Sequence, residues 1–257
     1  MHYVVRLVLL ICCAVAGLNM SPAEARRVAL VIGNAEHKFL PVLKNPINDA
    51  TDLAATLEKL NFDRVILKKD LGVEDFRAAL SELSHEAKDA EAAVVFFAGN
   101  GIQVDGRNYL IPVDARLASA REVEQETVAL EAVIEHVAEA KLGLIILDAC
   151  RDNPFRDQTR GLHRGTGQRG LAKTDHLQRG NLVLVFAALP DTVALDGAGR
   201  HSPFTEALLK HLPTPGLELR RLLVRVRAEV LAATGGRQVP EVWDRAPQDF
   251  FFAQAQR

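Results

Sequence analysis

Cys150 has the most reactive side chain in the later part of this sequence. It closes the segment 142–150, in which an apolar run is followed by Asp148, Ala149 and the cysteine. A thiolate is a nucleophile, whereas an arbitrary lone cysteine is most often a small buried apolar residue. Functional side chains gather where the strands of a parallel sheet end. The position just past an apolar run therefore favours a working thiol.

A second segment ends in a similar way. Residues 92–97 form an uninterrupted apolar run, followed by Ala98, Gly99, Asn100 and Gly101. If both runs are neighbouring parallel strands, their ends meet at one edge of the sheet. The histidines show no zinc-binding spacing such as H-E-x-x-H. The sequence thus predicts no metal site and no cofactor.

Short apolar runs alternate with amphipathic segments along the chain. Strands are expected at 28–32, 64–67, 92–97, 142–147, 181–188 and 249–253, and helices at 46–60, 73–88, 128–140, from Ser202-Pro203 onward and at 217–233. Residues 103–112 surround Asp105-Gly106, which is typical of a hairpin turn. Strands that are apolar on both faces and alternate with helices predict an α/β fold, with a mainly parallel sheet covered on both sides.

The first 25 residues are expected to leave the mature protein. Residues 7–18 are 12 apolar or small residues, whereas a membrane-spanning helix needs about 20. Ala23-Glu24-Ala25 then provides an A-x-A cleavage pattern. We predict a signal peptide at 1–25 and an exported, periplasmic or secreted chain without stable membrane insertion; an uncleaved anchor is the alternative. Cys12 and Cys13 would be removed with it, which leaves Cys150 alone.

The overall charge gives no indication of a nucleic-acid or membrane-surface partner. With 31 basic and 33 acidic residues, the formal net charge is −2. A balanced charge of this kind lacks the basic excess that nucleic-acid binding uses. A small-molecule binding protein of another α/β class is disfavoured, because no G-x-G-x-x-G loop follows the first strand.

Several motifs follow one another in a fixed order between residues 27 and 252. They are VALVIGN (28–34), LKNPINDA (43–50), GRNYLIPVD (106–114), DACRDNPF (148–155), RGLA (169–172), SPFT (202–205) and GRQVP (236–240). In this order they resemble bacterial caspase-like proteins of the caspase and metacaspase superfamily. The resemblance implies a caspase-like three-layer sandwich, built on a mainly parallel six-stranded sheet with helices on both faces.

The resemblance also implies a chemistry, cysteine-type peptide hydrolysis by a His–Cys dyad. Cys150 matches the nucleophile, and the backbone N–H groups of Cys150 and Gly101 match the oxyanion hole. Where the family pattern has small-Gly-His-Gly, this chain has Ala98-Gly99-Asn100-Gly101. Asn100 thus stands at the position of the dyad histidine. A carboxamide does not titrate near neutral pH and cannot exchange a proton with the thiol.

Impaired or lost peptidase activity is therefore expected. One alternative is an active endopeptidase that uses another proton-transfer group, for example His37, His163, His176 or His201. The other is a non-catalytic module that binds peptides or protein partners.

Two carboxylates match the acidic pocket of metacaspase-like enzymes with basic specificity. They are Asp49 and Asp148, and together they would bind an Arg or Lys side chain through charge-assisted hydrogen bonds. Alternatively, Asp49 is a helix first-turn acid favoured by the helix dipole, and Asp148 is a strand-end acid that binds backbone. The expected partner is a peptide or protein.

The resemblance divides the mature chain into three parts. A large-subunit-like part covers about 26–155, a basic loop 156–180 and a small-subunit-like part 181–257. The loop matches the family's processing and activation loop, and nothing in the sequence shows that it is cut.

Overall fold

The computed structural model describes residues 26–104, 106–150, 180–189 and 192–255. The predicted signal peptide, almost all of the basic loop at 156–180, and Asp105 lie outside these residues. The same holds for two of the alternative histidines, His163 and His176.

A mainly parallel sheet forms the centre of the molecule. Its strand order is β2-β1-β3-β6-β7-β8; outside this order, β4 pairs with β3, and β5 pairs with β4. The pairs β1–β2, β1–β3, β3–β6 and β6–β7 are parallel, and β7–β8 is antiparallel. These strands are β1 Arg27–Gly33, β2 Arg64–Lys69, β3 Ala92–Val104, β4 Arg107–Leu110, β5 Val128–Ala129, β6 Leu142–Cys150, β7 Leu182–Phe186 and β8 Glu241–Asp244. The predicted α/β class, with six strands in the main sheet, is confirmed.

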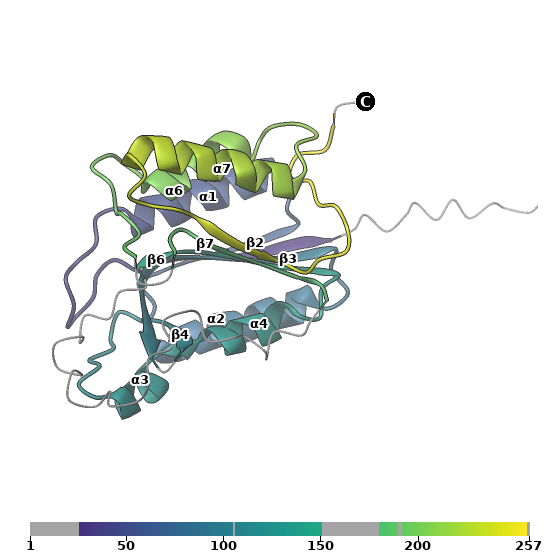
Figure 1. Ribbon diagram of the computed structural model, residues 1–257. Coiled ribbons are helices and arrows are strands. Elements are labelled where there is room, and N and C mark those ends of the chain that lie inside the picture. The colour runs from purple at the N-terminus through teal and green to yellow at the C-terminus, as the bar shows by residue number, and fades with distance from the viewer. Residues whose placement is uncertain (1–25, 105, 151–179, 190–191, 256–257) are drawn as a thin grey trace, which may run out of the picture.

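Helices cover both faces of this sheet (Figure 1). Helices α1, α6 and α7 form the upper layer, and α2 and α4 form the lower one. Their bounds, with those of the outlying α3, are α1 Pro46–Lys59, α2 Val73–Ala87, α3 Ala120–Glu126, α4 Leu130–Val137, α6 Pro203–His211 and α7 Leu219–Thr234.

The two cores follow from the alternation of side chains along each strand. In β1, Ala29 and Val31 pack under α1, α6 and α7, whereas Leu30 and Ile32 pack against α2 and α4. A strand covered on both sides must be apolar at every position. That requirement is why the inner strands were visible in the sequence as unbroken apolar runs.

The last strand was predicted in the wrong place. Residues 249–253 do not form one; Phe251 makes a single bridge to Glu218, while Phe250 and Phe252 are buried and pack edge to face. The sheet instead ends in the partly exposed Glu241–Asp244 segment. An apolar run alone does not distinguish a strand from a loop that fills the core.

Smaller differences concern element ends. Helix α4 is shorter than the predicted 128–140, because Val128–Ala129 pairs with β4 as a strand. The hairpin at 103–112 is confirmed by the antiparallel pairing of β3 with β4. Strand β6 extends through Cys150, so that this residue ends the strand rather than following it.

Candidate active site

Strands β3 and β6 bring the two predicted segments together. Their parallel register pairs Asn100 with Cys150 and Ala98 with Asp148 at the Cα level. The expected neighbourhood of Asn100 and Cys150 is therefore confirmed by the register, although only Cys150 ends its strand, since β3 continues past Asn100 to Val104. Their chemical roles remain predictions. Asn100 is half-buried. Because side chains alternate along a strand, Asn100 lies on the same face of the sheet as Ala98, which is the face covered by α1 and α6.

Gly101 lies where β3 leaves the main sheet and enters the hairpin with β4. It is buried and pairs with Leu110. The carbonyl of Asn100 accepts a hydrogen bond from the backbone N–H of Ile111 at 3.0 Å. The backbone around the predicted oxyanion position is thus fixed by pairing on both sides.

Asn34, from the first motif, ties the neighbouring loops to this edge. Its fully buried side chain accepts from the N–H of Leu71 at 2.9 Å and donates to the carbonyls of Leu71 and Ile111 at 3.3 and 3.4 Å. A buried side-chain amide that forms hydrogen bonds with several backbone groups stabilises the local structure. The motif therefore positions the site rather than performing chemistry.

Helix α1 reaches the same edge because β1 ends in glycine. A Cβ atom at Gly33 would collide with the carbonyl oxygen of Pro46, the first residue of the helix. This close approach places Asp49, in the first turn of α1, beside the ends of β3 and β6. Asp49 is 1% exposed and Asp148 is 7% exposed.

The start of helix α6 holds Asp148. Ser202 caps this helix by accepting from the N–H of Thr205 at 2.9 Å, and its hydroxyl donates a hydrogen bond to Asp148 Oδ2. The Thr205 hydroxyl donates to the same oxygen at 2.7 Å. The SPFT motif thus provides both the N-cap of helix α6 and two hydroxyl groups that donate hydrogen bonds to Asp148.

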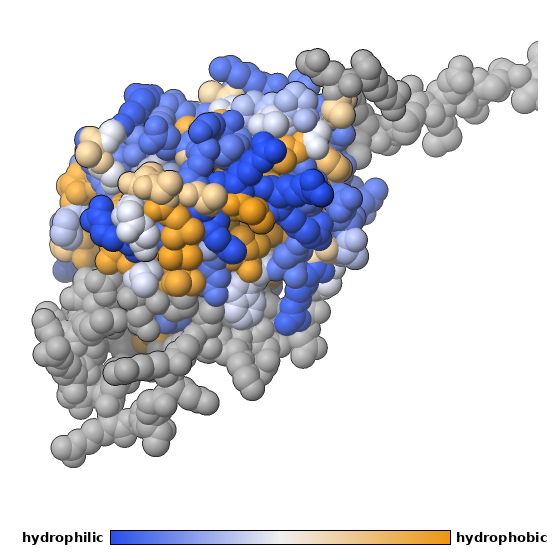
Figure 2. All heavy atoms as spheres, turned by 45° about the horizontal axis from the view of Figure 1, so that its top comes forward, coloured by the Kyte–Doolittle hydropathy of each residue, from blue (hydrophilic) through white to orange (hydrophobic). Residues whose placement is uncertain are grey.

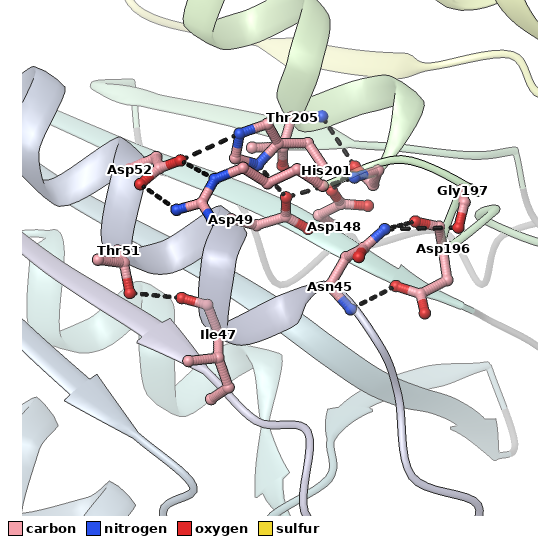
Figure 3. Close-up of polar contacts among 12 residues, drawn as sticks. Asn45, Ile47, Asp49, Thr51, Asp52, Asp148, Asp196, Gly197, His201 and Thr205 are labelled. Atoms are coloured by element: carbon pink, nitrogen blue, oxygen red, sulfur yellow. Dashed lines mark hydrogen bonds and ion pairs between the residues drawn. The ribbon is translucent and has the colours of Figure 1, made fainter.

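Asp49 is held from the other side of the same turn (Figure 3). Its Oδ1 accepts from the backbone N–H of Ser202 at 3.3 Å and contacts Nδ1 of His201 at 2.9 Å. Among the described residues, Asp49 Oδ2 and Asp148 Oδ1 accept no hydrogen bond.

Both acids line a small pocket at this edge of the sheet. Its other lining residues are Leu43, Pro46, Ala98, Gly99, Ala194, Leu195, Asp196 and Ser202. Asp196 is a third carboxylate, but it already accepts the backbone N–H groups of Lys44 and Asn45, at 2.7 and 3.2 Å. Asp196 therefore serves the loop at 44–45, whereas one oxygen of Asp49 and one of Asp148 accept no hydrogen bond from the residues that the structure describes.

Burial makes these carboxylates unusual acids. Burial raises the pKa of Asp49 to about 8, with repulsion from Asp148 as the next cause. Burial also raises the pKa of Asp148 to about 6, against the hydrogen bonds from Ser202 and Thr205. Strongly perturbed acids in a cleft are a signature of functional sites.

The rim of the pocket carries exposed apolar side chains. Val42 and Val193 are 60% and 47% exposed and flank lining residues on two different loops. Figure 2 shows a mainly hydrophilic outer side of the upper helix layer, with apolar side chains between the hydrophilic ones toward the left. A mixed surface of this kind suits contact with a peptide chain.

Neither of the described alternative histidines is hydrogen-bonded to Asn100 within the part of the chain that the structure describes. His201 is committed to the carboxylates. His37 is 6% exposed, neither ring nitrogen has a hydrogen-bond partner among the described residues, and burial lowers its pKa. A buried ring of lowered pKa is a poor substitute for the family histidine.

The sequence missed the outer part of this site. It did not assign Asp52, Asp196 or Arg200, and it gave no role to the contacts of His201. Asp49 and Asp52 are three residues apart in a predicted helix, and this i, i+3 spacing predicts that both side chains lie on the same helix face. The contacts from residues 196–201 join segments about 150 positions apart, which no local pattern reports.

Replacing Asp148 by Asn is expected to stabilise the fold above pH 6. The amide keeps an acceptor oxygen for Ser202 and Thr205 and removes a buried charge. The folded pKa of about 6 lies above the ordinary 3.8, so this group's contribution to stability is present below pH 4 and is lost as the pH rises through 6. Two pKa units correspond to about 3 kcal/mol, which sets the largest gain expected for the variant at pH 7.5.

Urea unfolding at pH 4 and at pH 7.5 measures this difference. The exposed Asp75→Asn on α2 serves as the matched control and should run parallel to the wild type. If Asp148→Asn also runs parallel to the wild type between these pH values, the carboxyl of Asp148 does not have a raised pKa.

Comparisons with known proteins identify the family of the chain. The caspase domain family matches residues 26–252, and the chain belongs to this family. It is 29% identical over 140 residues to the human mucosa-associated lymphoid tissue lymphoma translocation protein 1, and 28% identical over 140 residues to its mouse homologue. In both cases the match covers 54% of this chain and only 16% of the relative.

A solved structure shows the same fold. Caspase-1 from Spodoptera frugiperda superposes with a TM-score of 0.65 at 17% identity, over 90% of this chain and 92% of that one. The recognition of a caspase-superfamily protein and of a caspase-like sandwich is therefore confirmed.

Within the described ranges, no helix has the length and apolar character that crossing a membrane requires. The predicted signal peptide lies outside those ranges.

Proposed function

We propose that this chain is a caspase-like cysteine endopeptidase homologue that binds Arg or Lys side chains and has lost most of its peptidase activity. The observation that carries the proposal is the pairing of Asn100 with Cys150 in the register of the adjacent strands β3 and β6. The nucleophile of the family is kept, and the residue opposite to it cannot accept or donate a proton at neutral pH.

The missing proton transfer affects both halves of the reaction. The family histidine promotes attack by the thiolate on the amide carbonyl and protonates the leaving amine. Without it, attack depends on the few per cent of a free thiol that is ionised near pH 7. The amine must then leave without a general acid.

The basic specificity rests on Asp49 and Asp148. They come from different elements and line one pocket beside the strand ends. Carboxylate pairs bind a guanidinium group through charge-assisted hydrogen bonds. Asp148, one of the two acids, lies two residues before Cys150 on β6. This spacing suits a pocket for the side chain that precedes a scissile bond.

Export is the remaining part of the proposal. The A-x-A pattern at 23–25 and the short apolar run before it support removal of residues 1–25 and a periplasmic or secreted protein.

A thiol-reactive ketone that carries an arginine side chain tests the proposal. The wild type should be labelled slowly at Cys150, and Cys150→Ala should not be labelled, because the carboxylate pocket delivers the reactive carbon to the thiol. Mass spectrometry of the labelled peptide gives the position.

Two other results separate the alternatives. Rapid hydrolysis of an arginine peptide amide by the wild type would favour the active endopeptidase with another proton-transfer group. Peptide binding without any labelling of Cys150 would favour the non-catalytic binding module.

A further inference from the structure

Gln238, from the GRQVP motif between α7 and β8, has a fully buried side chain. Its side-chain oxygen accepts from the backbone N–H of Leu195 at 3.1 Å, and its side-chain nitrogen donates to the carbonyl of Ala187 at 3.0 Å. The orientation of the amide is fixed, because one partner can only donate and the other can only accept. Gln238 thus binds two backbone groups of the segment that follows β7.

The two backbone groups belong to different sides of the basic pocket. The N–H of Ala187 donates to the carbonyl of Leu147 at 2.9 Å, and Leu147 directly precedes Asp148 on β6. Leu195 itself lines the pocket. Gln238 therefore connects the loop at Leu195 to the strand that carries Asp148.

A second buried amide holds the same loop from the other direction (Figure 3). The Asn45 side chain is fully buried and donates to the backbone carbonyl of Asp196, while the backbone N–H of Asn45 donates to Asp196 Oδ1 at 3.2 Å. Asn45 is the N-cap residue of α1, the helix that carries Asp49. We call residues 194–196, which all line the pocket, the pocket wall.

The pocket wall depends on these side-chain anchors. None of the described residues between β7 and α6 belongs to a helix or a strand, and Leu195 is partly exposed. A segment of this kind lacks the regular backbone hydrogen bonds that fix a strand or a helix. Its position against the pocket is set by the few groups that bind it, and Gln238 is one of them.

We propose that Gln238 is a positioning residue of the basic pocket, which keeps the pocket wall in place against the aliphatic part of a bound Arg or Lys side chain. The inference rests on the proposed function, because it concerns the same pocket. Gln238 is not among the residues that line this pocket, so it acts on the ligand through Leu195. It adds to the proposed function a residue that determines affinity from outside the pocket.

The pocket wall and the carboxylates contribute separately to binding. Ala194 and Leu195 present apolar surface, which suits the methylene groups of a long basic side chain. Asp148 is held by the hydroxyl groups of Ser202 and Thr205 instead. Loss of the Gln238 amide should therefore move the wall and leave the carboxylates in place.

Gln238→Met tests the inference, because methionine has nearly the same length but no amide group. The half-saturation concentration of the arginine ketone that labels Cys150 should rise about tenfold. This factor corresponds to about 1.4 kcal/mol and lies within the usual net contribution of two hydrogen bonds. The limiting labelling rate at saturating ketone should not change, because the pairing of Asn100 with Cys150 in β3 and β6 does not involve Gln238.

Gln248→Met is the matched control, since it removes the same group at the opposite end of β6. The Gln248 side chain donates to the carbonyl of Lys141 at 2.7 Å, directly before that strand. This variant should have the half-saturation concentration of the wild type. Iodoacetamide, a thiol reagent without a basic side chain, should alkylate Cys150 equally fast in all three proteins. A merely structural role of Gln238 would lower the urea midpoint of Gln238→Met without changing the half-saturation concentration of the folded protein.

Hydrogen exchange gives a readout that needs no variant to fold. The N–H of Leu195 should be protected in the wild type, because it donates to a buried amide although its own residue is partly exposed. Rapid exchange at Leu195 would overturn the inference. Equal half-saturation concentrations in wild type and Gln238→Met would also overturn it while leaving the basic pocket intact. A wild type that the arginine ketone labels no better than its citrulline analogue would instead overturn the basic pocket, and with it the role of Gln238.

Discussion

Asn100→His should raise the turnover of an arginine-containing peptide amide by about 10²–10⁴-fold. This range is the usual contribution of a positioned general acid–base group and corresponds to roughly 3–5 kcal/mol of barrier. The expectation depends on the register of β3 and β6, in which residue 100 is the direct Cα partner of Cys150. The Cα atom of a histidine at this position would therefore lie directly opposite the Cα atom of Cys150.

Matched variants isolate the proton transfer. Asn100→Gln changes the size of the side chain without adding a titrating group, and it should gain nothing. Cys150→Ala in the Asn100→His background should remove the whole gain. Steady-state hydrolysis of an acetyl-arginine anilide gives all four rates, wild type included.

Two results would contradict this account. A wild type that is already fast would show that another residue supplies the proton transfer. A folded Asn100→His protein with no gain would show that a further part of the cleft has changed, with the oxyanion donors and the Asp49–Asp148 pocket as the first places to examine. The peptide-binding alternative would then stand, but Asn100 would not be the sole cause of inactivity.

The parts of the fold that were predictable are those where local sequence and burial agree. β1, β3, β6 and β7 lie inside the sheet, so every residue must be apolar and the run is visible without an alignment. The edge strand β8 contains Glu241, Trp243 and Asp244, and its burial is only partial. Its pattern resembles that of a surface loop. Residues 250–252, in contrast, resemble a strand in sequence because Phe250 and Phe252 are apolar and fill the core, where Phe252 stacks on Phe62.

The candidate site likewise contains some residues that the sequence predicts and others that it does not. Asp49, Asn100, Asp148 and Cys150 could be named because the family motifs mark those positions, and the structure gathers them at one edge. The Arg200–Asp52–His201 contacts depend on a loop that folds back over α1, between residues 148 or more positions apart. Such pairings are set by tertiary packing, and neither residue spacing nor helix periodicity reveals them.

The wild type is expected to bind acetyl-arginine methylamide at least about 10²-fold more tightly than its citrulline analogue. Citrulline has nearly the same shape as arginine but no charge, so the comparison isolates the contribution of Asp49 and Asp148. A hydrogen bond to a charged group contributes about 1.5–3 kcal/mol, and two of them give at least about 3 kcal/mol, or roughly 10²-fold. The preference should nearly vanish in Asp49→Asn/Asp148→Asn.

Asp196→Asn provides the sharper control, because this residue lines the same pocket. Its oxygens already accept the backbone N–H groups of Lys44 and Asn45, so its removal should reduce the arginine preference much less than removal of either pocket acid. An equal loss in all three single variants would mean that the pocket acts through its summed negative field rather than through two directed carboxylates. A preference of the wild type for an acetyl-aspartate amide would reject the assignment of both acids, since a pocket lined by carboxylates repels a further negative charge unless a cation lies between them.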